Sequence, residues 1–173
     1  MNMNDKIITR KSSDVELKSE TVFINRVAKG REGGRRIKFS ALVVVGDGKG
    51  LIGFGLGKGR EVSAAVAKGE LAAKKNLIKI PILKGTIPHE VYGKYDGSYV
   101  FFKPAAEGTS VKAGGVTRIV CEMAGITCIL SKCFRRNSRY NVVRATFIAF
   151  KKLRDPFKIA RDRGISLKKL FEF

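Results

Sequence analysis

Residues 26–60 read RVAKGREGGRRIKFSALVVVGDGKGLIGFGLGKGR, and this stretch decides how the chain is expected to fold. Three basic, glycine-rich segments, residues 26–38, 46–50 and 57–60, alternate in it with two apolar runs of strand length. Glycine permits backbone conformations with positive φ and the close approach of another molecule. Lys and Arg carry charge that suits phosphate groups. The pattern therefore predicts a sheet whose loops are turned toward a polyanion.

The first half of the chain is predicted to form a small two-layer module. Three runs rich in strand-forming side chains are followed by one helical pattern: residues 21–24, 39–45, 51–56 and 61–78. Asp-Gly within residues 46–50 favours a tight hairpin turn between the second and third strands. Gly53 and Gly55 fall on one face of the third strand, where small residues would let a helix lie close. We therefore predict a three-stranded antiparallel sheet with one helix packed on it.

The second half is predicted to form a sheet with two helices. Strands and helices follow in the order strand, strand, helix, strand, helix: residues 90–95, 99–104, 112–124, 126–134 and 141–153. Asp96-Gly97 lies in a second hairpin turn, Gly125 ends the first helix and Asn141 is expected to cap the second. Short helical segments follow Pro156.

The predicted fold class is α+β, built from two small two-layer modules. We place a disordered tail at residues 1–16, an RNA-binding-like domain at 17–80, a C-terminal domain at 81–154 and a helical extension at 155–173.

The chain carries a large positive charge. Its 173 residues include 35 Lys and Arg against 15 Asp and Glu, which gives a net charge of +20. A compact chain with this charge repels itself and attracts anions, so nucleic acid is the first candidate partner and an acidic membrane surface the second. The excess is +9 in each of residues 21–80 and 81–154, so both modules are expected to face the same polyanion.

The sequence also indicates in which kind of compartment the protein is found and whether it associates with a membrane. Cys121, Cys128 and Cys133 are an odd number, which excludes a full disulfide framework and favours reduced thiols in a cytosol-like compartment. The first residues lack the apolar stretch of a signal peptide, and no run of about 18 apolar residues could span a membrane. A membrane-surface role would require a long amphipathic helix with a large apolar face, and the sequence contains only short amphipathic segments.

Enzymatic sites find little support in the residue pattern. GKGLIG at residues 48–53 matches a dinucleotide-binding motif, but a strand-like run follows it instead of a helix. His89, the one histidine, could join the cysteines around a metal, yet thiol spacings of seven and five are not those of zinc sites. We expect no catalytic residue, no metal and no cofactor. An enzyme that acts on RNA or nucleotides through its glycine loops stands as the second hypothesis.

Basic residues beside glycines are the candidate phosphate contacts. The first cluster lies on the three loops of the opening stretch: Arg26, Lys29, Arg31, Arg35, Arg36, Lys38, Lys49, Lys58 and Arg60. The second lies before and within the start of a helix, whose dipole also favours phosphate: Arg135, Arg136, Arg139 and Arg144. Trp is absent and most aromatic residues are Phe in strands, so recognition of the backbone and shape of folded RNA is favoured over base stacking.

The ordered motifs between residues 17 and 153 resemble the bacterial-type small-subunit ribosomal protein S-five family. The segments that carry the resemblance are NRV (25–27), GGR (33–35), FSALVVVGDGKG (39–50), GFG (53–55), GK (57–58), REV (60–62), PAAEGT (104–109), AGG (113–115) and NVVRAT (141–146). The resemblance implies an N-terminal module like a double-stranded-RNA-binding domain. It also implies a C-terminal module of a sheet plus two helices, and no enzymatic activity.

Several partners follow from this resemblance as expectations. They are small-subunit rRNA, mRNA near the channel where it enters, and the neighbouring proteins S-four and S-eight, with influence on assembly and decoding accuracy. Residues 29–36 match the loop that the family inserts into RNA. The residues expected to meet S-four are Gly108, Thr109, Ser110 and Arg118. The protein is not expected to be a homo-oligomer, and its place is a cytoplasmic small subunit, with an organellar ribosome left open.

Three stretches depart from the family pattern. The family often has Gly-Thr-Gly where this chain has Gly108-Thr109-Ser110, and Asn-Pro where it has Ser138-Arg139. This chain also has Arg31-Glu32 where an apolar residue and commonly a Lys are expected.

Overall fold

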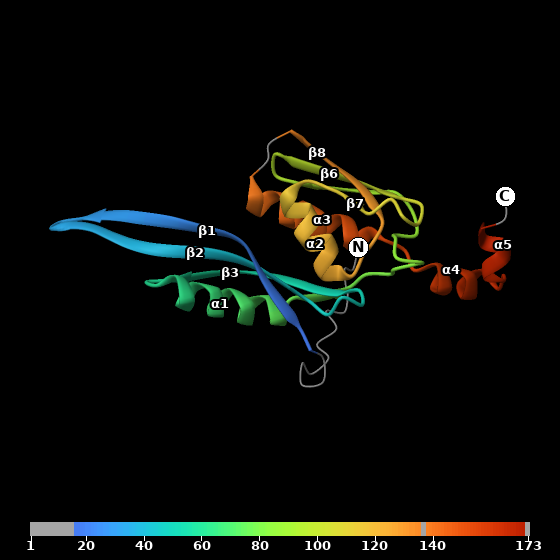
Figure 1. Cartoon of the computed structure of the whole chain (residues 1–173), viewed down its shortest axis with the longest axis horizontal. Helices are drawn as coiled ribbons and strands as arrows, with labels where there is room; N and C mark the ends of the chain where they lie inside the picture. Colours follow the sequence, from blue (N-terminus) through green and yellow to red (C-terminus); the bar gives the residue numbers. More distant parts are fainter. Residues whose placement is uncertain (1–15, 136–137, 172–173) are drawn as a thin grey trace. The chain divides into compact units, whose positions relative to one another are not determined.

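The computed structural model describes residues 16–135 and 138–171 of the chain. They form two compact units, and the elements of each are drawn in Figure 1. The first unit comprises the described residues up to Lys79 together with Ile119–Gly125. The second comprises Ile80–Arg118 and the described residues from Ile126 onward. Of the predicted N-terminal tail, residues 1–15 lie outside the described residues.

The first unit is built on a four-stranded antiparallel sheet covered on one face by a helix (Figure 1). Its strands, in spatial as well as chain order, are β1 (Lys18–Arg31), β2 (Gly34–Gly46), β3 (Leu51–Gly59) and β4 (Leu77–Lys79). The helix is α1 (Val62–Lys75). Because side chains alternate along a strand, every second residue of β2 reaches the helix. Two apolar clusters result: Ala41 and Val43 with Ala65, and Val45 with Ala73 and Leu77.

Three alternate glycines of β3, Gly53, Gly55 and Gly57, let α1 lie close to the sheet. A Cβ atom on each would collide with the carbonyl oxygen of a helix residue, in the order Ala73, Gly69 and Ala65. These three carbonyls are four residues apart, so one line of the helix surface runs along one line of the strand. The close approach predicted from Gly53 and Gly55 is thus confirmed, and Gly57 extends it.

The predicted end of the first helix is wrong. Leu77 and Ile78 continue the helical spacing, but α1 ends at Asn76, whose backbone N–H donates to the carbonyl of Ala73 at 3.0 Å. The chain then turns into β4, which pairs antiparallel with β3 through Ile52 and Ile78. The open edge of β3 offers unpaired backbone groups, and β4 satisfies them. The sheet therefore has four strands instead of the predicted three.

The predicted basic loop at residues 29–36 is also different in the structure. The ladder between β1 and β2 continues to the pair Arg31 and Gly34, which leaves Glu32 and Gly33 as the turn. Gly33 has φ 85°, a left-handed conformation that glycine adopts in a turn without strain. Backbone pairing satisfies donors and acceptors that a loop would leave to water, so this basic segment is a hairpin tip.

The second unit has a mixed sheet of four strands with order β5-β6-β8-β7. The strands are β5 (Val91–Tyr95), β6 (Ser98–Pro104), β7 (Val111–Lys112) and β8 (Ile129–Arg135), and the pair β7–β8 is parallel. Its main helix is α3 (Arg139–Lys152). The helix α2 (Gly115–Ala124) starts in this unit, and its residues from Ile119 onward are counted with the first unit. Helix α3 packs on one face of the sheet, where the rings of Phe102 and Phe150 lie 4.9 Å apart between centroids.

Three boundaries in this unit differ from the predictions. Lys112, the predicted start of the helix, belongs instead to β7, because Val111 and Lys112 pair in parallel with Ile129 and Leu130; α2 begins at Gly115. The last strand begins at Ile129, three residues later than predicted. Asn141 is not the cap of α3, which starts at Arg139; the Asn141 amide donates instead to Asp96 Oδ2 at 2.8 Å.

The C-terminal extension is helical, as predicted. It contains α4 (Pro156–Arg163) and α5 (Leu167–Phe171). Asp155 caps α4 by accepting the backbone N–H of Phe157 at 3.0 Å, and Gly164 ends it at φ 65°.

Candidate nucleic-acid interface

The outer part of the β1–β2 hairpin is a two-stranded arm. The last pair between β2 and β3 joins Phe39 to Gly59, so residues 27–38, which we call the arm, pair with each other and with no third strand. Every arm residue whose side chain the structure describes is exposed. The arm therefore offers both of its faces to a partner.

The register of the arm sorts its cations onto two faces. Directly paired residues of an antiparallel ladder share a face, and the faces alternate along each strand. Lys29 is paired with Arg36, and Lys38 lies two residues further along β2, so these three side chains share one face, the arm face. Arg26 and Arg35 occupy the opposite face, the one that carries Phe39 toward α1. The side chain of Arg31 lies outside the described part.

In the part of the chain that the structure describes, the positive charges of the arm face are not neutralised by nearby carboxylates. Like charges on directly opposed positions destabilise a strand pair, and Lys29 stands opposite Arg36. Glu32, in the turn, is the one acidic residue between positions 21 and 46. The described residues provide no salt bridge for any of the three cations of the arm face. An external polyanion would remove this repulsion.

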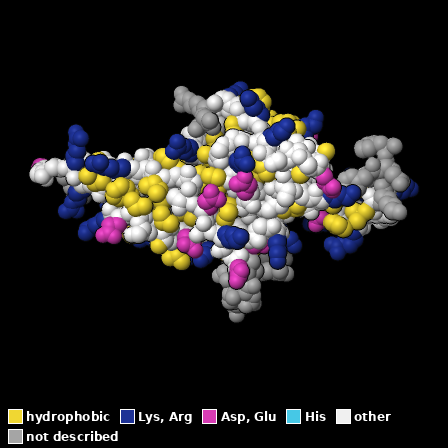
Figure 2. All heavy atoms as spheres, in the orientation of Figure 1, with side chains coloured by type: hydrophobic (Ala, Val, Ile, Leu, Met, Phe, Trp, Pro, Cys, Tyr) yellow, Lys and Arg dark blue, Asp and Glu magenta, His cyan; other side chains and the backbone are white. Residues whose placement is uncertain are grey.

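Apolar side chains lie among the cations of the hairpin. Ile24, Val27 and Ile37 are 43%, 40% and 41% exposed. Figure 2 shows Lys and Arg side chains over β1 and β2 with hydrophobic side chains between them. Such a surface suits the sugars and base edges of a nucleic acid as well as its phosphates.

The other predicted contacts of the first unit lie nearer the sheet. Lys49 is exposed in the β2–β3 turn, where Asp47 Oδ1 accepts the backbone N–H groups of Lys49 at 2.7 Å and Leu51 at 2.9 Å. Lys58 pairs with Ser40 and so continues the line of the arm face. Arg60 is exposed beside the start of α1.

The N-terminus of α1 adds donors to this cationic surface. Its N-cap residue, Glu61, makes no side-chain hydrogen bond to the first turn. The first N–H groups of a helix and its dipole favour an anion. With Lys58 and Arg60 alongside, this junction can receive a backbone phosphate.

The second predicted cluster is only partly brought together. Arg135 and Arg139 are exposed at the end of β8 and the start of α3, and Arg136 lies outside the described residues. Arg144 is half-buried and already engaged: its Nη1 donates to Tyr95 Oη at 2.6 Å, and its guanidinium lies 4.9 Å from the centre of the Tyr95 ring. Its role as an RNA contact stays a prediction.

The residues predicted to meet a protein neighbour lie on a loop and a helix of the second unit. Gly108, Thr109 and Ser110 form part of the β6–β7 connection, with φ 87° at Gly108 and 63° at Ser110. A serine in this region is strained, by about 1 kcal/mol. Arg118 is exposed on α2.

The three cysteines are free and differ in environment. Burial raises the pKa of the Cys121 and Cys133 thiols above the ordinary value. Cys128 is different, because hydrogen bonds from the Thr127 side chain and then from the backbone around Ser110 lower the pKa of its thiol, against the effect of burial.

We expect the alkylation of Cys128 to reach half its maximal rate at a lower pH than that of Cys133. A lowered pKa means that the reactive thiolate forms earlier as the pH rises. Iodoacetamide labelling from pH 6 to 10, with peptide mapping by mass spectrometry, measures both profiles. Cys121, fully buried, should be labelled only after denaturation. A lower midpoint for Cys133 would contradict these assignments.

The described residues offer no alternative site for metal chemistry. They contain no cluster of three or more His, Cys, Asp and Glu side chains. Both ring nitrogens of His89 have backbone partners: Nε2 accepts from the Arg154 N–H at 3.1 Å, and Nδ1 lies 2.8 Å from the Glu90 carbonyl. The motif at residues 48–53 runs from a hairpin turn into β3 and opens no helix. No described helix is long and apolar enough to cross a membrane.

Fold and charge together define a class, that of basic α+β proteins of two modules whose exposed cations suit a polyanion. The chain belongs to the ribosomal protein S5 family. The family models described as "Ribosomal protein S5, N-terminal domain" and "Ribosomal protein S5, C-terminal domain" match residues 17–81 and 93–163. Members of this family are structural, non-enzymatic constituents of the ribosome, and RNA binding is general among them.

Curated relatives resemble the chain over nearly its whole length. A protein of Bacteroides thetaiotaomicron named "Small ribosomal subunit protein uS5" is 52% identical over 160 residues, which cover 92% of this chain and 93% of the relative. Proteins of the same name from Phocaeicola vulgatus and Porphyromonas gingivalis are 51% and 50% identical, over 92% and 94% of this chain and 94% and 95% of theirs.

Sequence reasoning missed one group of aromatic residues, on the second sheet. Tyr92 and Phe134 are exposed and Tyr99 is half-buried, and the three lie on three adjacent strands. The alternation of apolar and other residues along β5 and β6 could have indicated that alternate aromatic residues face outward.

Proposed function

We propose that this protein is a structural constituent of the small ribosomal subunit and binds small-subunit rRNA through its arm face. The observation that carries the proposal is the set of Lys29, Arg36 and Lys38 on one face, with two of them directly opposed and no described carboxylate to neutralise them. The names of the bacterial relatives support the placement in a small subunit. Lys49, Lys58 and Arg60 extend the same contact toward α1, and Arg135 and Arg139 supply a second one.

We further propose the position of the protein within the subunit. The arm lies near the channel through which mRNA enters, and the protein supports assembly and translational accuracy there. The loop with Gly108, Thr109 and Ser110, together with Arg118, meets the neighbouring protein S-four, and S-eight is a second neighbour. One copy acts per subunit without forming a homo-oligomer. Relatives of three bacterial genera support a ribosome of the bacterial cytoplasm.

Salt dependence tests the proposal. Binding to small-subunit rRNA is expected to weaken steeply with salt, with a slope of log K against log salt of about −3 or steeper, because each neutralised phosphate contributes roughly 0.7 to 0.9. Filter binding between 50 and 400 mM potassium chloride measures the slope. A flat dependence would contradict the proposal.

Gradient sedimentation tests whether the protein is part of the small-subunit particle. An epitope-tagged chain is expected in the small-subunit fractions of a sucrose gradient at physiological salt, and to be released from them by high salt. Calorimetry with free nucleotides is the control for the enzyme hypothesis, and no saturable binding is expected.

A further inference from the structure

The second sheet has an exposed face that α3 does not cover. Gly93 and Phe102 lie on the covered face, where a Cβ atom on Gly93 would collide with the carbonyl oxygen of Ala145 in α3. Because side chains alternate along each strand, the residues immediately before and after Gly93 and Phe102 face the other way. Tyr92 and Phe134 on that side are 55% and 46% exposed.

Six of the outward side chains form two rows across three strands. The register aligns Lys94 with Tyr99 and Tyr99 with Phe134 in one row. It aligns Tyr92 with Phe101 and Phe101 with Lys132 in the next. We call these six residues the aromatic face. Each row holds two rings and one cation, with the cation on β5 in the first row and on β8 in the second.

Three of the four rings of the aromatic face, which we call the platform, neighbour one another in the order Tyr92, Tyr99 and Phe134. The centroids of Tyr92 and Tyr99 are 5.7 Å apart with planes at 24°, and those of Tyr99 and Phe134 are 5.8 Å apart at 53°. A shallow hollow of about 790 Å³ lies beside them, lined by Lys94, Tyr99, Phe101, Phe134 and Arg135. This volume is ample for a planar ring system with its attached groups.

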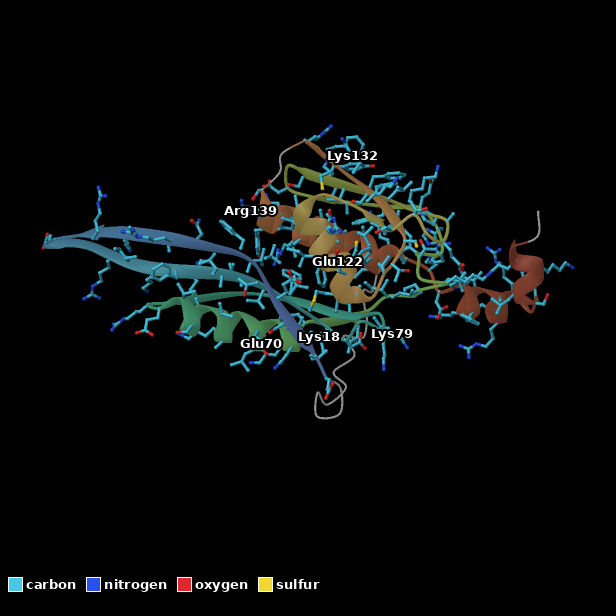
Figure 3. The ribbon with its side chains drawn as sticks, in the orientation of Figure 1. Lys18, Glu70, Lys79, Glu122, Lys132 and Arg139 are labelled. Carbon is cyan, nitrogen blue, oxygen red and sulfur yellow. The ribbon has the colours of Figure 1, made fainter. Side chains whose placement is uncertain are left out.

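The charge around the platform has one sign. Strands β5, β6 and β8 contain Lys94, Lys103, Lys132 and Arg135 and no Asp or Glu. Figure 3 labels Lys132 on β8. The carboxylate of the β5–β6 turn, Asp96, accepts a hydrogen bond from Asn141. A partner that matches this face carries flat rings and negative charge together.

We propose that the aromatic face binds unpaired RNA nucleotides, with bases stacked on Tyr99 and Phe134 and phosphates beside Lys94 and Lys132. Every base has a ring face that can stack on an aromatic side chain, whereas a duplex keeps its bases stacked internally. A neutral apolar protein surface would leave the four cations without partners. The site is separate from the arm and adds a single-strand contact to the function proposed for the whole chain.

The experiment uses the full chain with the arm neutralised, Lys29→Gln, Arg36→Gln and Lys38→Gln, so that arm binding does not mask the second site. An eight-nucleotide oligouridine carrying a fluorophore reports affinity by anisotropy. Adding Tyr99→Leu and Phe134→Leu is expected to weaken its binding by about tenfold or more, because ring stacking is lost. Tyr99→Phe, which keeps the ring, should bind within about twofold of the parent.

Three further readouts make the outcome specific. The leucine substitutions should leave the salt slope unchanged, while Lys94→Gln with Lys132→Gln should reduce it by about 1 to 2. In a chain whose arm is not mutated, the leucine substitutions should leave the affinity for a 16-base-pair RNA duplex unchanged. A 5-bromouridine oligonucleotide should crosslink under ultraviolet light to peptides containing Tyr99 or Phe134.

Two results would overturn the proposal. One is oligouridine binding within about twofold of the parent in a leucine variant that keeps its circular dichroism and Tm. The other is crosslinking confined to peptides outside β5, β6 and β8, which decides the question even where the leucine variant unfolds. Either result leaves rRNA binding by the arm standing, and would favour a protein partner for this face.

Discussion

Neutralising Lys29, Arg36 and Lys38 together is expected to weaken binding to small-subunit rRNA by on the order of 100-fold at physiological salt. The three cations share the arm face, and no described carboxylate competes for them. Their loss should also reduce the salt slope by about 2 to 3, one phosphate contact for each charge removed. Filter binding of the Lys29→Gln, Arg36→Gln, Lys38→Gln variant over a salt series measures both effects.

A matched variant separates the arm face from net charge. Lys151→Gln, Lys158→Gln and Arg161→Gln remove three exposed cations from α3 and α4 and change the net charge equally. We expect a loss of no more than about threefold from this change, since long-range attraction alone is screened at physiological salt. Equal losses in the two variants would show that the arm is not a specific contact. Neither variant should alter the Tm by more than a few degrees, because the arm contributes little to the core and the three cations of α3 and α4 are exposed.

Replacing Gly57 with valine is expected to destabilise the first unit by about 3 kcal/mol or more, at the upper end of the cost of overpacking. The new Cβ atom would collide with the carbonyl oxygen of Ala65 and with the backbone of Gly69. The three atoms it would meet, the Ala65 carbonyl oxygen and the N and Cα atoms of Gly69, all belong to the backbone of α1. No side-chain rotation can therefore relieve the collision, and α1 must move away from β3. At about 4 °C per kcal/mol, the Tm of this unit should fall by about 12 °C or more.

Gly30 provides the matched control for that substitution. It is also a strand glycine, but a Cβ atom there would meet nothing within 4 Å. Gly30→Val should therefore leave the Tm within about 2 °C, since valine also suits a strand. Differential scanning calorimetry of both variants tests the pair. A Gly57→Val protein with unchanged melting would contradict the close packing of α1 on β3.

The packing of the first sheet could be predicted because its determinants are local and periodic. Gly53 and Gly55 fall on one face at a period of two, and Asp47-Gly48 demands a turn between two apolar runs. The helical pattern of α1 was equally clear, but its end was not. Leu77 and Ile78 fit a helix as well as a strand, and the open edge of β3 decides between them.

Which charges lie opposite each other could not be predicted without the register of the strands. Lys29 and Arg36 are seven residues apart in sequence, and glycines around them suggest a loop; pairing of β1 with β2 is what sets them opposite each other. The aromatic face was missed for a related reason. Its rings come from three strands, and β8 reaches β6 only through pairing between distant parts of the chain. Arg144 looked like a surface charge because its partner, Tyr95, lies 49 residues away.

The departure at Ser110 gains a physical meaning from the structure. Its left-handed backbone, φ 63°, is a conformation that glycine adopts without strain, and glycine is the residue that the resemblance leads us to expect there. The strain falls on the loop proposed to meet S-four. From the sequence alone, the change is only a replacement of one small residue by another.

The two-stranded arm also has a consequence for the life of a copy that has not joined a subunit. A hairpin without a third strand is at best marginally stable in water, and this one has like charges facing across it. Such a segment should exchange its amide protons quickly and accept proteases readily in the free protein. The rRNA contact proposed for the arm would then protect it, so a free copy should be cleaved first in the arm.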